Sequence, residues 1–365
     1  METMRIAWFN WKCIKHPEAG GAEVFTHEVA RRIAGMGHEV TLITSRPKGL
    51  PLREEVDGYT VLRSGNKFTV YLNAKKLYEK YLENRVDVVI DETNTLPFFT
   101  IIYVREPVIA LIHQLAREYW FLETKPPLSI IGYLMEPQYL KLYKNVPTVT
   151  VSNSTKEDLE RLGFKKIHVV PEGLSIKPLN ELPDKEEDPT IIFLGRLRKI
   201  KRPDHVVKAF IEVVREEPQS KLWIVGDGPL RRRLEKTVEK NGLSSNVVFH
   251  GRVGDEEKVR LLRKAHVLVL PGVREGWGLV VIEAYSQGTP AIAYDVPGLR
   301  DSVRHLKTGI LVPQGNIRLL AKSMIYVLQN NKLREKLARE ALEWSKQFDW
   351  NNTAMELLKV IKTYV

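Results

Sequence analysis

The feature that most constrains the fold is an alternation of short apolar segments with amphipathic segments, which occurs twice along the chain. In residues 1–172, runs rich in Val, Ile and Leu alternate with stretches whose apolar residues recur at helical spacing. The same alternation begins again at residue 190. Short apolar strands between helices are typical of parallel strands that are buried on both faces. We therefore predict an α/β protein with two doubly wound, Rossmann-like domains.

The predicted strands fall into two series. Those of the first series are residues 4–9, 39–44, 59–63, 86–90, 108–112, 148–152 and 167–170. Those of the second series are residues 190–195, 221–226, 246–250, 266–271, 289–294 and 309–313. The stretch 171–190 is rich in Pro and acidic residues and lacks periodicity, as is typical of a linker. We predict a first domain over 1–172, a linker over 173–189 and a second domain over 190–350.

Composition and charge exclude several classes of protein. No apolar run approaches the roughly 20 residues that span a bilayer, and the start of the chain lacks the pattern of a signal peptide. Cys13 is the single cysteine, which fits a reducing cytoplasm. The net charge of +11 is uneven, with +2 in residues 1–172 and +9 in the remainder. We expect the basic half to bind a ligand that carries phosphate, and we expect no nucleic-acid partner.

Glycines and basic residues follow several predicted strands. In such folds ligands bind at the carboxyl ends of the strands. Gly20 and Gly21 precede a predicted helix and offer backbone N–H groups to an anion. Arg196 and Lys201, in the stretch GRLRKIKRP, can supply a guanidinium fork and an ammonium to a diphosphate. The turn that begins at Gly226 allows close approach of a backbone, although each of these loops also has a purely structural interpretation.

The stretch EGWGLVVIE places two carboxylates around a predicted helix N-terminus. Glu275 lies in the loop, Gly276 and Gly278 form the turn, the helix begins near Leu279, and Glu283 falls near the end of its first turn. The N-terminus of a helix favours a phosphate. An acid on each side could accept hydrogen bonds from hydroxyl groups that flank this phosphate. A nucleoside diphosphate that carries a sugar has this layout.

Other nucleotide-binding signatures are missing from the sequence. There is no G-x-G-x-x-G after the first strand, no Walker A motif and no D-x-D triplet. We therefore expect neither a nicotinamide cofactor nor a metal-dependent nucleotide-sugar site, and we predict no cofactor at all.

The motifs together resemble the retaining glycosyltransferases of family 4, whose GT-B architecture has two Rossmann-like domains that face each other across a cleft. The resemblance covers nearly the whole chain and is carried by GGAE (20–23), GHEVTLIT (37–44), His113, SNSTKEDLERLG (152–163), GRLRKIK (195–201), GDGP (226–229) and EGWGLVVIEAYSQGTPAIA (275–293). It implies that the first domain binds the acceptor and the second binds the donor. It also implies that the final helix, 351–365, packs back on the first domain.

The resemblance implies a role for each matching residue. Arg196 and Lys201 would bind the donor diphosphate, Glu275 the donor sugar and Glu283 the ribose. His113 would lie near the donor sugar and Gly21 near the diphosphate. Backbone near His250, Gly251 and Arg252 would contact the base, and backbone near Gly278 and Leu279 the phosphate or sugar. On this basis His113, Arg196, Lys201 and Glu275 are the predicted catalytic residues.

Three positions depart from the family pattern. Arg202 replaces the usual Gly after the diphosphate lysine, Glu172 stands where Asn is common, and Asp301 takes the place of a Glu. These departures put loop closure at Arg202 and a sugar contact at Glu172 in doubt.

The resemblance implies transfer of a sugar from a UDP-, GDP- or ADP-sugar to an acceptor hydroxyl, with retention of configuration and without a metal ion. The acceptor would be a saccharide, a lipid-linked sugar or a small polyol. The alternatives are a GT-B phosphorylase or synthase that acts on a soluble disaccharide, and a non-catalytic subunit that binds a nucleotide-sugar. A hydrolase is disfavoured because Glu275 and Glu283 belong to the donor site.

The acceptor side is poorly specified by the sequence. Residues 116–144 are aromatic and apolar and end in basic residues. Such a stretch can be a surface for a lipid-linked acceptor, with peripheral membrane contact through the first domain. A buried pair of helices explains the same pattern and is the interpretation that we favour from sequence. The expected location is the cytoplasm, with membrane association as an option.

Overall fold

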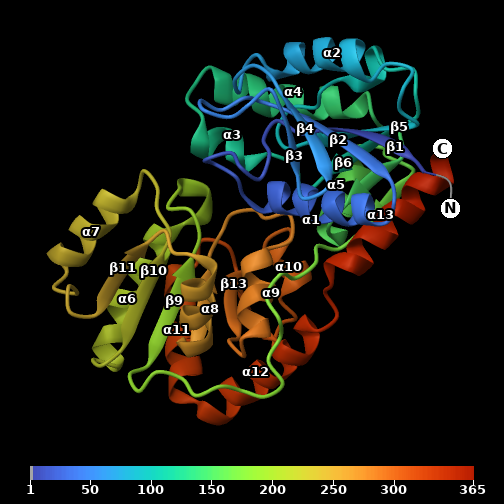
Figure 1. Ribbon diagram of the computed structural model, residues 1–365. Coiled ribbons are helices and arrows are strands. Elements are labelled where there is room, and N and C mark those ends of the chain that lie inside the picture. Colours follow the sequence, from blue (N-terminus) through green and yellow to red (C-terminus); the bar gives the residue numbers. More distant parts are fainter. Residues whose placement is uncertain (1–2) are drawn as a thin grey trace. The chain divides into compact units, whose positions relative to one another are not determined.

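The computed structural model describes residues 3–365 and divides the chain into two compact units (Figure 1). The first unit comprises Met1–Arg117, Pro127–Gly173 and Phe348–Val365. The second comprises Glu118–Pro126 and Leu174–Gln347. The short segment Glu118–Pro126 therefore groups with the second unit, although our predicted first domain includes it. The predicted linker also groups with the second unit, apart from Gly173.

The first unit is built on an eight-stranded sheet with the order β3-β4-β2-β1-β5-β6-β7-β8. All its strand pairs are parallel except β3 with β4. Its strands are β1 Arg5–Phe9, β2 Glu39–Thr44, β3 Arg53–Val56, β4 Tyr59–Arg63, β5 Val88–Thr93, β6 Val108–Ile112, β7 Thr148–Thr150 and β8 Ile167–Val169. Its helices are α1 Gly21–Gly35, α2 Val70–Tyr81, the 3-10 turn η1 Thr100–Ile102, α4 Leu128–Lys141, α5 Asn153–Arg161 and α13 Trp350–Tyr364.

The last helix, α13, packs on α1 within the first unit. The ring of Trp350 meets the ring of Phe25 edge to face, and Thr353 donates a hydrogen bond to the carbonyl of Pro171. Gly173 permits this approach, because a Cβ there would lie 2.5 Å from the backbone nitrogen of Trp350. The apolar face of α13 thus completes the core of a unit whose strands lie far away in sequence.

The second unit is built on a six-stranded parallel sheet with the order β11-β10-β9-β12-β13-β14. Its strands are β9 Thr190–Leu194, β10 Lys221–Val225, β11 Val247–Gly251, β12 Val267–Leu270, β13 Ala291–Tyr294 and β14 Gly309–Val312. Its helices are α3 Glu118–Glu123, the 3-10 turn η2 Lys199–Lys201, α6 Pro203–Glu216, α7 Arg231–Lys240, α8 Asp255–Lys264, α9 Leu279–Ser286, α10 Leu299–Ser302, α11 Ile317–Gln329 and α12 Asn331–Ser345.

The two doubly wound units confirm the predicted fold class, and every predicted strand is present. The strand β3 was not predicted, because its sequence REEV is polar and only Val56 is buried. The expectation of a buried helix pair over 116–144 is wrong for α4. Six large apolar side chains in and just after this helix are exposed: Leu128, Ile130, Ile131, Leu134, Met135 and Leu142.

No helix among the described residues combines the length and the apolar character that crossing a membrane requires.

Candidate functional site

The predicted site residues of the second unit gather at one edge of its sheet. Arg196 and Lys201 follow β9, Gly226 follows β10, and Glu275 lies in the loop after β12. His250 and Gly251 end β11, and Arg252 follows them. Because β11, β10, β9 and β12 are neighbours in the sheet, their carboxyl ends bring these loops together.

Lys201 and Glu275 are bound to each other at the centre of this edge. The Lys201 Nζ donates to both carboxylate oxygens of Glu275, at 2.6 Å from Oε2. Glu275 is 8% exposed and the Lys201 side chain 23% exposed, so the ion pair is partly shielded from water. The loop of Glu275 is held by a hydrogen bond from its N–H to the carbonyl of Pro297. Gly298 permits this arrangement, because its φ is +82° and a Cβ there would lie 2.1 Å from the carbonyl oxygen of Glu275.

The turn that carries Arg196 rests on the turn that begins at Gly226. The N–H of Leu197 donates to the carbonyl of Asp227, and the N–H of Gly195 donates to that of Val225. A Cβ at Gly226, whose φ is +127°, would lie 2.1 Å from the carbonyl oxygen of Gly195. This glycine thus lets two backbones touch. The Arg196 side chain is exposed above them and is available to an anion.

Arg202 has a left-handed backbone, with φ 51° and ψ 44°, between η2 and α6. A non-glycine residue is uncommon in this conformation. The family's usual glycine at this position would adopt it freely, so the departure changes the side chain without changing the turn.

Glu283 lies on α9 and forms an ion pair with a lysine of α8. Its Oε1 lies 2.9 Å from Nζ of Lys258, which lies on α8. Burial raises the pKa of Glu283, and the ammonium of Lys258 opposes this effect. Gly278, with φ +95°, is the residue that precedes α9, as predicted for the turn between the two carboxylates. Asp301 accepts a hydrogen bond from the N–H of Gly298 and so caps α10.

The segment α3 is bound to the same loops. Glu118 accepts a hydrogen bond from Nε of Arg274 at 2.7 Å, and Glu123 accepts one from the N–H of Ile200 at 3.0 Å. Arg274 directly precedes Glu275 in the sequence, and Ile200 directly precedes Lys201. No sequence motif predicted a contact between α3 and these loops.

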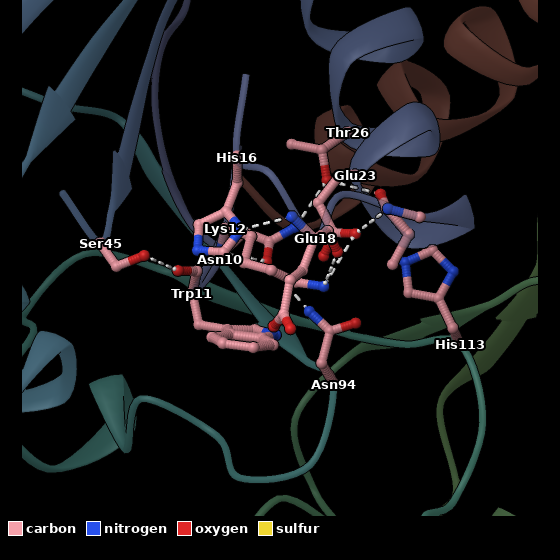
Figure 2. A network of polar contacts seen from close by, with 12 residues as sticks. Asn10, Trp11, Lys12, His16, Glu18, Glu23, Thr26, Ser45, Asn94 and His113 are labelled. Carbon is pink, nitrogen blue, oxygen red and sulfur yellow. Dashed lines mark hydrogen bonds and ion pairs between the residues drawn. The ribbon is translucent and has the colours of Figure 1, made fainter. Parts of the chain in front are cut away.

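His113, a predicted site residue of the first unit, lies in a buried polar network (Figure 2). Glu92, at the end of β5, accepts hydrogen bonds from Trp8, Asn10 and Thr26 and contacts Nε2 of His113 at 3.1 Å. Sequence reasoning missed Glu92, because the predicted strand ended before it. Acidic residues directly after an apolar strand were the sequence signal that could have indicated Glu92.

His113 lies between two carboxylates. Its Nδ1 is 3.5 Å from Oε1 of Glu172, and its Nε2 faces Glu92. Burial alone would lower the pKa of His113, but the carboxylates of Glu172 and Glu92 outweigh this effect and raise it to about 10. The imidazolium is therefore favoured at neutral pH. Because both ring nitrogens face protein carboxylates, a direct bond from His113 to a sugar remains a prediction.

Gly20 and Gly21 begin α1 as predicted, but a carboxylate already caps this helix. The N–H of Gly20 donates to Oε2 of Glu23 at 2.6 Å, and Lys12 lies 3.3 Å from the same oxygen. Glu23 is 2% exposed. The Gly20 N–H that we expected to face an anion is thus engaged, whereas Gly21 is exposed.

Two family models match the chain. The model for Glycosyltransferase Family 4 matches residues 19–177, and the model for Glycosyl transferases group 1 matches residues 177–344. The chain belongs to the group 1, family 4 glycosyltransferases. The predicted site residues lie within the two matched regions, and those of the second unit all fall in the second region.

Relatives and solved structures agree with this assignment. The glycosyltransferase is 28% identical over 242 residues to an uncharacterized glycosyltransferase of Methanocaldococcus jannaschii, a match that covers 62% of each protein. It is also 28% identical over 243 residues to the phosphatidyl-myo-inositol mannosyltransferase of Mycobacterium leprae, covering 65% of this chain and 63% of that protein. The matches thus span less than two thirds of these relatives' lengths.

The solved structures show the GT-B fold. Sucrose-phosphate synthase from Thermosynechococcus elongatus aligns with a TM-score of 0.83 at 21% identity, covering 99% of this chain and 98% of that one. The Anabaena protein HepE, whose structure contains UDP and glucose, aligns with a TM-score of 0.74 at 15% identity, covering 99% of this chain and 100% of the other.

Proposed function

We propose that the protein is a retaining glycosyltransferase that moves a sugar from a nucleotide-sugar to an acceptor hydroxyl without a metal ion. The observation that carries this proposal is the Lys201–Glu275 pair, which lies beside the Arg196 turn at the carboxyl edge of a parallel sheet. A cation and a carboxylate in contact can serve a donor whose diphosphate is anionic and whose sugar offers hydroxyl groups. The N-terminus of α9 adds a second attraction for the diphosphate.

The chemistry requires stabilisation of the departing nucleoside diphosphate. As the bond between the sugar and the diphosphate breaks, negative charge grows on the phosphate oxygens. Lys201 and Arg196 are placed to stabilise this charge, which is the role that a metal ion has in other enzymes. Glu275 would orient the sugar while its new bond to the acceptor oxygen forms, and the proton of the acceptor hydroxyl would pass to an oxygen of the departing diphosphate. No side chain is proposed as a covalent nucleophile.

The donor can be identified by its effect on stability. A ligand that binds the folded state raises the melting temperature by mass action. We expect one of UDP, GDP or ADP and its sugar derivatives to raise the melting temperature by several degrees at millimolar concentration. Differential scanning fluorimetry with this panel measures the effect. If no member shifts the transition, the nucleotide-sugar assignment fails.

Turnover separates the proposed enzyme from its alternatives. Release of nucleoside diphosphate that depends on an added acceptor hydroxyl supports a transferase, and NMR of the product reports the configuration at the anomeric carbon. Tight donor binding without turnover on any acceptor would instead favour a non-catalytic subunit. Consumption of inorganic phosphate as co-substrate would favour a phosphorylase.

The outer face of α4 supports a lipid-linked acceptor. We define this face by the exposed apolar residues Leu128, Ile131, Leu134, Met135 and Leu142. The buried residues of the same helix are Ser129, Gly132, Glu136, Tyr139 and Leu140. Glu136 is the sole acid between residues 124 and 145 and is buried, where it accepts hydrogen bonds from the backbone of Ala116 and Arg117.

A large exposed apolar patch marks an interaction surface. Lys141 and Lys144 lie exposed at the end of this helix, and the patch itself carries no negative charge. An apolar helix face with adjoining lysines fits the interface of an anionic bilayer. The protein would thereby reach an acceptor that is held in the membrane by its lipid.

Vesicle binding tests this surface. We expect the protein to sediment with vesicles of phosphatidylcholine and phosphatidylglycerol, and the double variant Leu134→Glu/Met135→Glu to lose roughly tenfold in affinity, because two charges would enter the interface. Tyr326→Glu, an equally exposed site on α11, is the matched control and should bind as the wild type does. Equal binding by all three proteins would contradict the proposed membrane contact and leave the transferase assignment untouched.

A further inference from the structure

We propose that Lys258 is a positioning residue for the donor, which holds the Glu283 carboxylate oriented toward the ribose. This inference rests on the proposed function, since it assumes that a nucleoside diphosphate binds at this edge of the second unit. It adds a residue that neither the sequence motifs nor the family resemblance indicated.

The geometry ties two carboxylates to one ammonium. The Nζ of Lys258 lies 2.9 Å from Oε1 of Glu283 and 3.1 Å from Oδ1 of Asp255. The side chains of Lys258 and Glu283 are 21% and 15% exposed, whereas that of Asp255 is 94% exposed. The contact with Glu283 is therefore the shielded one. A charge-assisted hydrogen bond in such a setting restricts the rotamer of the carboxylate and leaves its second oxygen for another donor.

The same ammonium connects two parts of the predicted nucleoside site. Lys258 lies on α8, which begins at Asp255, three residues after Arg252. Glu283 lies on α9, which begins directly after Gly278. The turn assigned to the base and the carboxylate assigned to the ribose are thus linked by one side chain. Moving either helix would stretch this contact, so Lys258 fixes the distance between the two subsites.

The electrostatics of the neighbourhood agree with this role. Burial raises the pKa of Glu283. The ammonium of Lys258 opposes this effect but does not cancel it, so the pKa stays above its ordinary value. Burial lowers the pKa of Lys258, but Glu283 and Asp255 outweigh this effect, so that its pKa is raised. Helix α12 and the strands β12 and β13 also pack on α9. Within the described residues they contribute no charge that shifts the pKa of Glu283. Without Lys258, a buried Glu283 would hold its proton to higher pH.

The test compares the binding of nucleotides that carry both ribose hydroxyls with the binding of nucleotides that lack one. We expect Lys258→Met to weaken binding of the ribonucleotides UDP, GDP or ADP about tenfold at pH 7, measured by titration calorimetry with whichever of them the wild type binds. The loss should grow as the pH falls, because removal of Lys258 takes away the charge that opposes the raised pKa of Glu283. Binding of the matching 2′-deoxy and 3′-deoxy diphosphates should change little, so that discrimination for ribose collapses. Lys258→Arg should restore both affinity and discrimination.

Two further variants make the outcomes distinct. Lys240→Met, an exposed site on α7 of the same unit, is the charge-matched control and should bind as the wild type does. Glu283→Gln should lose discrimination for ribose at every pH. If Lys258→Met binds ribose and deoxyribose diphosphates as the wild type does, or loses both equally, the positioning role is wrong while the donor site stands. If Glu283→Gln also keeps full discrimination, the proposed ribose contact itself is wrong.

Discussion

Replacement of either member of the Lys201–Glu275 pair is expected to abolish sugar transfer while leaving the fold intact. In Lys201→Ala the departing diphosphate loses a cation, and loss of one such stabilising group typically lowers kcat by roughly 100- to 1,000-fold. In Glu275→Ala the sugar loses the carboxylate that would orient it, and misplacement of the reacting carbon has a comparable effect. Acceptor-dependent release of nucleoside diphosphate measures both losses.

Because the two side chains contact each other, their effects should not add. Each single variant leaves the partner without its counter-ion in a shielded position. The double variant Lys201→Ala/Glu275→Ala should therefore be little worse than either single variant. Lys199→Ala, an exposed lysine on the same 3-10 turn, is the control and should retain activity within about twofold. Turnover like that of the wild type in either single variant would refute the site assignment, provided that calorimetry shows each protein to be folded.

The architecture could be predicted because its strands are almost wholly buried. Strands such as β9 and β12 carry apolar residues at every or nearly every position, and in a soluble chain such runs fit only a sheet covered on both faces. The strand β3 escaped prediction for the opposite reason. Its residues are mostly polar, and it pairs with β4 alone at the antiparallel edge of the sheet. Pairing of this kind depends on the neighbouring strand rather than on a local pattern.

The orientation of α4 could not be predicted from periodicity. The helix is apolar on much of its circumference, so its sequence does not say which face turns inward. Its inward face packs Tyr139 and Leu140 into the core and places Glu136 where it accepts hydrogen bonds from the N–H groups of Ala116 and Arg117. A carboxylate in an apolar helix was the available sign that this side has a structural partner.

The positions of the predicted donor-side residues at the strand ends could be predicted from sequence motifs. The contacts that these residues make could not be predicted in this way. Arg196, Lys201, Glu275 and Glu283 follow strands or begin a helix, and parallel topology brings such positions together. That Lys201 contacts Glu275, and that Lys258 contacts Glu283, depends on the packing of loops and helices from different parts of the chain. A lysine on a highly charged helix such as α8 has the pattern of a solvated face, so its role is visible only in three dimensions.

The second large effect is expected on stability, at the buried carboxylate of Glu92. This group is fully buried and receives hydrogen bonds from Trp8, Asn10 and Thr26, besides its contact with the His113 ring. Glu92→Ala would remove the acceptor of the Trp8 indole N–H and of one amide N–H of Asn10, and it would leave an imidazolium with one carboxylate fewer. Breaking a buried ion pair typically costs about 3–5 kcal/mol. We expect the melting temperature of Glu92→Ala to fall by roughly 10 °C, whereas Glu157→Ala, which removes an exposed carboxylate on α5, should change it by less than about 2 °C.

The pH dependence of stability tests the charge of His113. Its pKa is raised to about 10 in the folded protein, above its ordinary value of 6.5. A raised pKa contributes stability that is fully present below pH 6.5 and is lost as the pH rises through about 10. Urea denaturation of the wild type between pH 6 and pH 10 should therefore show the free energy of unfolding falling as the pH rises. In His113→Gln this component of the slope should vanish, because the neutral amide does not titrate. If the variant and the wild type lose stability in parallel over this range, His113 is neutral between its two carboxylates and the buried cation does not exist.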